Sequence, residues 1–115
     1  MLQAELADPS VLALGCRDAD GRLLAAARVQ VDPGHPAVAE IGRLTVVPDR
    51  QREGLGSLLL AAIEDAMPAT VTELRLFTGE RSKENLRLYI RHGYLEDNRE
   101  PTAAGYALVH LRKRR

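Results

Sequence analysis

The sequence is poor in aromatic residues, with no tryptophan and an aromatic fraction of 3%. Hydrophobic residues nevertheless make up 45% of the 115 residues. The core must therefore be filled by leucine, valine, alanine and isoleucine instead of rings. A chain of this length supplies enough apolar surface for one core and too little for two. We expect a single domain over residues 1–115 with an aliphatic, tightly packed interior.

Cysteine is also scarce, and Cys16 is the only one. A single cysteine excludes an internal disulfide framework and argues against a small secreted scaffold. The N-terminal residues lack the basic and apolar segments of a signal peptide, and no run approaches the roughly 20 apolar residues of a membrane span. The three histidines, His35, His92 and His110, have no metal-ligand spacing. We expect a cytoplasmic protein without a metal site or a membrane partner.

Net charge is absent as well, because sixteen basic residues balance sixteen acidic ones. A strong global field that would attract nucleic acid is therefore excluded, and any anion must be bound locally. The basic run 112–115 could serve a nucleic-acid-binding domain. We expect instead that these terminal charges form a frayed, solvated tail, and we expect no nucleic-acid partner.

Hydrophobic patterning predicts three sequential antiparallel strands in the first half of the chain. Val11–Cys16 and Leu23–Val31 are apolar runs separated by the turn residues 18–21, which is typical of a β-hairpin. The breaker cluster 32–36 precedes a third strand, Val38–Val47, which Pro48 ends.

The second half alternates helices and strands. Apolar residues from Leu55 to Ala66 recur at helical spacing, and Pro68 ends that helix. A strand at Glu73–Thr78 precedes a second helix, in which Ser82 is expected to be the side-chain cap and Gly93 the left-handed C-terminal residue. Closing strands are expected at residues 94–95 and 106–111. The expected class is α/β (α+β), with the order β-β-β-α-β-α-β-β.

The segment 44–57 is the most informative, because it runs from a strand through a loop into a helix. Helix N-termini expose unpaired amides and the positive end of the helix dipole, and Gly54 and Gly56 would let an anion approach the backbone. The lysine of a P-loop and the third glycine of a dinucleotide fingerprint are absent. Taken alone, the two glycines are better explained by a tight turn.

Two ordered motifs argue against that simple explanation. Gln51-Arg52-Glu53-Gly54-Leu55-Gly56 resembles the Gln/Arg-x-x-Gly-x-Gly/Ala signature of the GNAT superfamily of acetyltransferases. The later segment 85–94, which contains Leu88-Tyr89 and Gly93-Tyr94, resembles the same family's Leu-Tyr-x-x-x-Gly-Phe/Tyr motif. The resemblance runs from about Val11 to the C-terminus. It implies the GNAT fold, a mixed and mostly antiparallel twisted sheet, with acetyl-CoA as the cosubstrate.

The resemblance also implies which residues hold acetyl-CoA. Backbone groups of Leu44, Thr45 and Val46 would pair with the pantetheine arm like an added strand. The pyrophosphate would be held by the amides of Arg52, Glu53, Gly54, Leu55, Gly56 and Ser57. The family's asparagine position falls on Ser82, which a helix cap explains more simply, and Asn85 is a further candidate contact.

Acyl transfer to an amine needs a group that removes a proton from the ammonium and one that protonates the departing thiolate. Glu40 lies an even number of residues before Val46 and is expected on the same strand face, which resembles the position of a family glutamate base; a solvated strand-end carboxylate is the alternative. Tyr89 matches the family tyrosine that serves the thiolate, and a core tyrosine is the alternative. Cys16 has no recognisable base beside it, so a covalent intermediate is not expected.

The family usually supplies a first strand and one or two helices before the hairpin, and we expect all of them to be missing here. Their absence would leave a sheet edge and an apolar face uncovered, which predicts a homodimer. The sequence therefore predicts an N-acetyltransferase that acts on a primary amine by direct attack in a ternary complex. The alternative is a non-catalytic acyl-CoA-binding or regulatory module. The sequence does not identify the acceptor.

Overall fold

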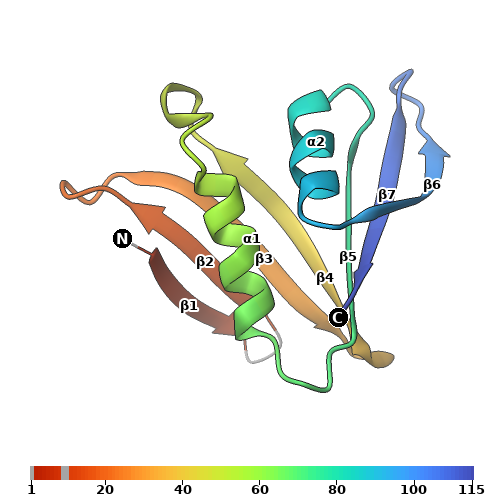
Figure 1. Cartoon of the computed structure of the whole chain (residues 1–115), viewed down its shortest axis with the longest axis horizontal. Helices are drawn as coiled ribbons and strands as arrows, with labels where there is room; N and C mark the ends of the chain where they lie inside the picture. The colour runs from red at the N-terminus through yellow and green to blue at the C-terminus, as the bar shows by residue number, and fades with distance from the viewer. Residues whose placement is uncertain (1, 9–10) are drawn as a thin grey trace.

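The computed structural model describes residues 2–8 and 11–115, with backbone only for residues 2–8 and Arg43 (Figure 1). The elements in chain order are β1 (Leu2–Asp8), β2 (Val11–Arg17), β3 (Leu23–Asp32), β4 (His35–Val46), a 3₁₀ turn (Pro48–Arg50), α1 (Leu55–Ala66), β5 (Glu73–Gly79), α2 (Lys83–Arg91), β6 (Leu95–Pro101) and β7 (Ala107–Arg114). Within these described ranges, neither helix is long and apolar enough to cross a membrane.

The strands form one seven-stranded sheet in the order β1-β2-β3-β4-β5-β7-β6. All neighbouring pairs are antiparallel except β4 and β5. Those two parallel strands pair only between Val38–Glu40 and Glu73–Arg75, and beyond that point they separate. Figure 1 shows the resulting wedge, with α2 lying between the diverging strands. The wedge matters for function because β4 loses its β5 partner after Glu40.

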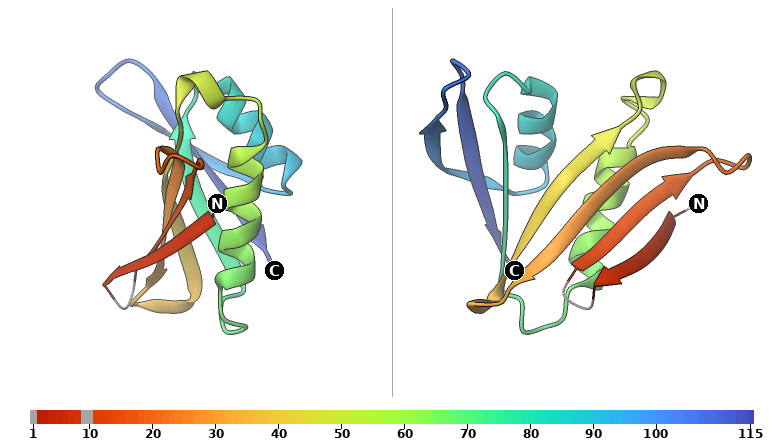
Figure 2. Two further views of the ribbon diagram at one scale, coloured as in Figure 1. Left: turned by 90° about the vertical axis from the view of Figure 1, so that its left-hand side faces the viewer. Right: turned by 180° about the vertical axis from the view of Figure 1, so that it is seen from behind.

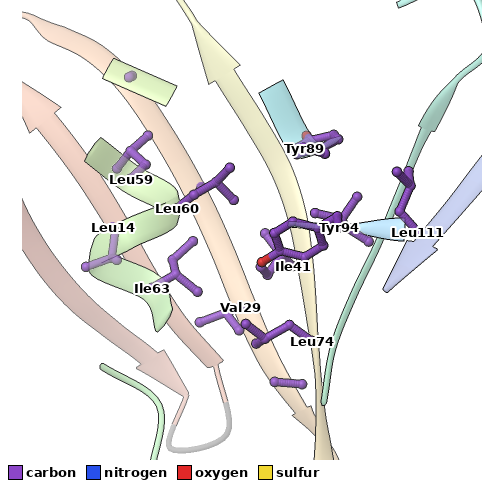
Figure 3. Packing of buried hydrophobic residues seen from close by; sticks show 14 of the residues in the cluster. Leu14, Val29, Ile41, Leu59, Leu60, Ile63, Leu74, Tyr89, Tyr94 and Leu111 are labelled. Carbon is purple, nitrogen blue, oxygen red and sulfur yellow. The ribbon is translucent and has the colours of Figure 1, made fainter. Parts of the chain in front are cut away.

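The core lies between the sheet and the two helices, which occupy the same face (Figure 2). Leu59, Leu60 and Ile63 of α1 are fully buried against alternate residues of the strands. The predicted aliphatic interior is confirmed, with one addition. Tyr89 and Tyr94 are also buried, and their rings meet edge to face with centroids 6.1 Å apart (Figure 3).

Strand β1 corrects the expected element order, because the first strand is present. It pairs antiparallel with β2, from Leu2 opposite Cys16 to Asp8 opposite Val11. Leu2, Ala4 and Leu6 alternate with polar residues at the period of a strand, a short signal that the sequence interpretation did not use. β1 ends at Asp8 and β2 begins at Val11, which leaves no room for a helix between them.

Over β3, β4 and β5, the uncovered face of the sheet is not the apolar surface on which the homodimer prediction was based. Residues of β3 and β4 that face away from the helices include Arg28, Gln30 and Glu40, all exposed. Phe77 is exposed on the same face of β5, beside charged neighbours. The missing strand, one reason for expecting a dimer, is therefore wrong. The bare apolar face, the other reason, is wrong for β3, β4 and β5, and the dimer itself stays a prediction.

The C-terminal basic run is ordered, which corrects the expectation of a frayed tail. Residues 112–114 belong to β7, and the Arg115 amide donates to the Thr72 carbonyl at 2.8 Å. The Arg115 guanidinium donates to the carbonyl oxygens of four residues at the end of α1 and after it: Glu64, Met67, Pro68 and Val71, at 3.0–3.4 Å. A cation at a helix C-terminus complements the unpaired carbonyls there.

Candidate active site

An open groove with a volume of about 920 Å³ lies where the two sequence motifs meet. One wall comes from the end of β4, the following loop and the start of α1, and the other comes from α2. The groove is lined by Leu44, Thr45, Val46, Arg50, Gln51, Arg52, Gly54, Leu55, Gly56, Ser57, Glu84, Asn85, Arg87, Leu88 and Arg91. The fold thus brings together most of the residues that the family resemblance assigns to acetyl-CoA. Glu53 and Ser82 do not line it.

The N-terminus of α1 points free backbone donors at this groove. Gly54 is the N-cap in the left-handed region, with φ 82°, and no side chain caps the helix. The backbone amides of residues 51–57 donate to no other described residue, and the first helical bond is from the Leu58 amide to the Gly54 carbonyl. These unpaired amides and the helix dipole together favour an anion.

Gly54 and Gly56 serve different physical purposes. Gly54 has open space around it but needs its positive φ, which non-glycine residues seldom adopt. Gly56 is buried, and a Cβ there would lie 2.9 Å from Leu88 Cδ2. The missing side chain of Gly56 therefore lets α1 and α2 approach each other. The sequence analysis explained both glycines by the approach of an anion to the backbone, and it missed this contact between the helices.

Four arginines, Arg50, Arg52, Arg87 and Arg91, line the groove. Arg50 pairs with Glu53 at 3.2 Å, and Arg52 pairs with Glu84 at 3.2 Å.

Arg87 and Arg91 make no ion pair with any residue that the structure describes. Both side chains are exposed and lie one helical turn apart on α2, so they can meet a bound anion together. Sequence reasoning missed them, although the i, i+4 spacing of two arginines inside the second motif was a usable signal.

A hydrogen bond between His92 Nε2 and Ser57 Oγ, 2.9 Å long, joins the end of α2 to the first turn of α1. It ties the two groove walls together at the helix end that presents the free amides. The sequence analysis considered the histidines only as metal ligands, so it did not predict this contact.

The second motif ends as predicted but begins differently. Gly93 has φ 91°, and the amides of Gly93 and Tyr94 donate to the carbonyls of Ile90 and Tyr89, which is the expected left-handed C-terminal arrangement. Ser82 occupies the N-cap position, yet its side chain makes no capping hydrogen bond. Its ψ of 67° lies outside the extended region in which a cap hydroxyl reaches the helix amides. The predicted side-chain cap is therefore wrong.

A β-bulge in β4 overturns the predicted orientation of Glu40. Ala26 pairs with Thr45 and Arg28 with Gly42, so β4 has one extra residue between these pairs. Val46 consequently faces the core, opposite buried Ala25, whereas Glu40 lies opposite exposed Gln30. The two residues are on opposite faces of the sheet, because the bulge shifts the period of two on which the prediction was based.

Tyr89 lies near the end of α2, between β4 and β5 in Figure 3, and is 4% exposed. No described residue hydrogen-bonds its hydroxyl group. Burial raises the pKa of Tyr89 to about 12, so the phenol is protonated at neutral pH. A protonated phenol can act as an acid toward a thiolate and cannot act as the base. Tyr89 does not contribute to the groove lining, so it belongs to the layer beneath it.

Glu40 is the last β4 residue paired with β5 and is exposed on the face away from the helices. Its carboxylate makes no ion pair with a described residue. It lines a second pocket of about 220 Å³ on that face. The two predicted catalytic residues therefore approach the wedge from opposite sides of the sheet.

Comparison with known proteins identifies the family of this chain. Residues 2–94 match the acetyltransferase (GNAT) family. The chain belongs to this family. The predicted GNAT fold is thereby confirmed, and the groove lies where the two GNAT motifs meet.

Two curated relatives are similar to this GNAT chain. The mycothiol acetyltransferase of Clavibacter michiganensis subsp. michiganensis is 41% identical over 88 residues, which is 76% of this chain and 28% of the relative. The mycothiol acetyltransferase of Clavibacter sepedonicus is 41% identical over 83 residues, which is 72% of this chain and 22% of the relative. The chain thus spans about a quarter of the length of these relatives.

Solved GNAT structures share the fold. A crystal structure described as a putative phosphinothricin N-acetyltransferase superposes with a TM-score of 0.81 at 22% identity, covering 93% of this chain and 73% of that one. The spermidine/spermine N-acetyltransferase SpeG from Vibrio cholerae superposes with a TM-score of 0.76 at 15% identity, covering 95% of this chain and 68% of that one. At these identities the likeness concerns the fold alone.

Proposed function

We propose that this chain is an N-acetyltransferase that moves an acetyl group from acetyl-CoA to a primary amine by direct attack in a ternary complex. The observation that carries the proposal is the α1 N-terminus, where the amides of residues 51–57 donate to no described residue and lie beside Arg87 and Arg91, which pair with none. Free amides and guanidinium groups are the donors that a pyrophosphate and a further phosphate require. We assign this activity to a single domain spanning residues 1–115.

The rest of acetyl-CoA fits the wedge. Because β4 has no β5 partner after Glu40, the strand edge at Leu44–Val46 is open on the β5 side. Amide groups of a pantetheine arm can pair with such an edge as an added strand does. The amides of residues 52–57 then hold the pyrophosphate. Asn85 lines the groove and is a polar contact for the cosubstrate, whereas Ser82 and the Glu53 side chain are not supported as contacts.

The catalytic groups divide between the two faces. Acetyl-CoA supplies a thioester, whose carbonyl carbon the amine attacks. Glu40, on the outer face at the apex of the wedge, takes a proton from the incoming ammonium directly or through a water molecule. Tyr89, on the helix face and protonated because its pKa is about 12, gives a proton to the thiolate. The acceptor therefore enters from the face opposite the groove.

The test combines binding and turnover. Titration calorimetry should give a micromolar dissociation constant for CoA, and thiol release from acetyl-CoA should accelerate with a primary amine. Replacing Arg87 and Arg91 together by glutamine should weaken CoA binding by roughly a hundredfold, because each charge-assisted hydrogen bond is worth about 1.5 kcal/mol or more and every 1.4 kcal/mol is tenfold in affinity. Arg114→Gln, at an exposed position on β7 away from the groove, is the matched control. Equal CoA affinities in the wild type, the double variant and the control would show that Arg87 and Arg91 do not bind the phosphates.

A non-catalytic acyl-CoA-binding or regulatory module is the second candidate function. It is favoured by one observation, that Tyr89 does not line the groove. Micromolar CoA binding without acetyl transfer to any member of an amine panel would decide for the module. Acetylation of any panel member at a rate above the uncatalysed one would decide against it.

The assembly and location of the protein are further proposals. β1 is the edge of the sheet, and its outer backbone groups have no strand partner among the described residues. Pairing of two such edges would give a homodimer. Sedimentation at micromolar concentration tests this, and an active monomer would refute it. We place the protein in the cytoplasm because Cys16 is its only cysteine, which fractionation of cells would test.

A further inference from the structure

The pocket of about 220 Å³ on the outer face has a lining unlike that of the cosubstrate groove. It contains carboxylates, guanidinium groups and an aromatic ring within a small space. Its polar and aromatic lining includes Glu40 from β4, Arg75 and Phe77 from β5, Asp97 from β6, and His110 and Arg112 from β7. The pocket begins at Glu40, where β4 and β5 separate, so it opens beside the apex of the wedge.

The sheet register places three of these charges in one row. Glu40 lies opposite Arg75 on β5, and Arg75 lies opposite Arg112 on β7. Neighbouring strands are about 4.8 Å apart, so one carboxylate is followed by two guanidinium groups across roughly 10 Å. The row offers one anionic position and one cationic position. The side chains are long enough for both positions to reach the two charged groups of one small molecule.

Much of the hydrogen-bonding capacity of this row is unused within the described chain. Glu40 has no ion-pair partner among the residues that the structure describes. Arg112 approaches Glu73 at 3.9 Å and Asp97 at 3.7 Å, both longer than a hydrogen bond. Arg75 donates to Glu73 through Nε at 2.5 Å, and its two terminal nitrogens donate to no described side chain, so they can hold a planar anion.

We propose that this pocket binds the acceptor, and that the acceptor is a free α-amino acid. Its ammonium would lie against Glu40, and its carboxylate would be held by Arg75 and Arg112. The exposed ring of Phe77, which packs beside His110 with centroids 5.6 Å apart, would contact the amino-acid side chain. A polyamine fits this row poorly, because its second ammonium would meet two guanidinium groups. This assignment rests on the acetyltransferase function proposed above.

The reaction that follows is balanced. The α-ammonium loses one proton to Glu40, the neutral nitrogen forms a bond to the acetyl carbonyl carbon, and the carbon–sulfur bond breaks. The departing thiolate takes a proton from Tyr89. The acylated nitrogen then loses its second proton, which returns to the Tyr89 phenolate through water, and Glu40 releases the first proton to solvent. The products are an N-acetyl amino acid and CoA. Arg75 and Arg112 bind the carboxylate and take no part in the bond changes.

The test compares each L-amino acid with its carboxamide, which keeps the amine and loses the negative charge. We expect the wild-type kcat/KM to be at least tenfold higher for the acid in the preferred pair. Arg112→Gln should reduce that preference to within about threefold by lowering only the value for the acid. Arg75→Gln should act in the same direction, and Arg114→Gln should leave the preference unchanged. Because each ratio is measured within one protein, a partly unfolded variant does not mimic the result.

Two other results would overturn the inference. Equal rates for acid and amide, or faster acetylation of spermidine than of any amino acid, would show that the row does not select a carboxylate, while leaving the acetyltransferase function intact. Binding without turnover is followed separately, by NMR titration of the ring signals of Phe77 and His110 with the amino acid. Saturable shifts in a protein that fails to bind CoA would support the pocket and refute the function. No shifts at millimolar amino acid would refute the pocket.

Discussion

Replacing Tyr94 by phenylalanine is expected to stabilise the fold. Tyr94 is fully buried at 0% exposed, and its hydroxyl oxygen has no hydrogen-bond partner within the described chain. A buried polar group without a partner costs about 1–3 kcal/mol, because it gives up its hydrogen bonds to water and gains none. The phenyl ring keeps the edge contact with Tyr89. Tyr94→Phe should therefore raise the free energy of unfolding by about 1–3 kcal/mol.

Urea and thermal denaturation followed by circular dichroism would measure this change. For a domain of about 100 residues, 1 kcal/mol shifts Tm by roughly 4–8 °C, so the effect is well above the error. Tyr106→Phe is the matched control, because the Tyr106 side chain is only half-buried and its hydroxyl makes no hydrogen bond to a described residue. A loss of stability in Tyr94→Phe, with none in the control, would show that the Tyr94 hydroxyl is satisfied and would refute the reasoning.

Further predictions concern stability and turnover. Because burial raises the pKa of Tyr89 to about 12 and also raises the pKa of Tyr94, whereas ordinary tyrosine titrates near 10, the unfolded state loses these protons first, so urea titrations should show stability falling by about 1.4 kcal/mol per pH unit for each of the two tyrosines between pH 10 and 12 and not below; a flat profile would contradict the burial. Gly56→Val should destabilise the protein by about 1–3 kcal/mol through overlap with Leu88, whose Cδ2 would lie 2.9 Å from the new Cβ, and Leu88→Ala should recover part of the loss in the double variant. Glu40→Gln should lower kcat roughly a hundredfold with an unchanged dissociation constant for CoA, and wild-type turnover would remove Glu40 from the mechanism. Arg115→Ala should lower Tm because four carbonyls lose their donor, and an unchanged Tm would show that these hydrogen bonds do not stabilise the fold.

Elements with a strong period were predictable from the sequence. The apolar spacing of α1, the Gly93 ending of α2 and the strands of the first hairpin all have local physical signatures, and each is confirmed. The strand β1 and the docking of Arg115 were not predicted. Their stabilising partners, β2 for one and the end of α1 for the other, are set by tertiary contacts that a terminal segment does not reveal.

The site was predictable where it depends on one segment and not where it depends on register. The free amides of α1 follow from a helix that starts at a glycine without a capping side chain. The face of Glu40 depends on a bulge that adds one residue to β4, and no composition signal marked it. The row of Glu40, Arg75 and Arg112 joins three strands distant in sequence, so only the sheet order brings them together.

The central claim, that the α1 N-terminus holds the phosphates of acetyl-CoA, can be tested by titrating ¹⁵N-labelled protein with CoA and following the backbone amide signals by NMR. We predict saturable shifts of the amides of residues 52–57, together with those of Leu44–Val46. The dissociation constant should be in the micromolar range, which corresponds to a binding free energy of about −8 kcal/mol. Amides of β6, on the far edge of the sheet, should not move. Saturation without any shift in residues 52–57, or no saturable binding at millimolar CoA, would contradict the account.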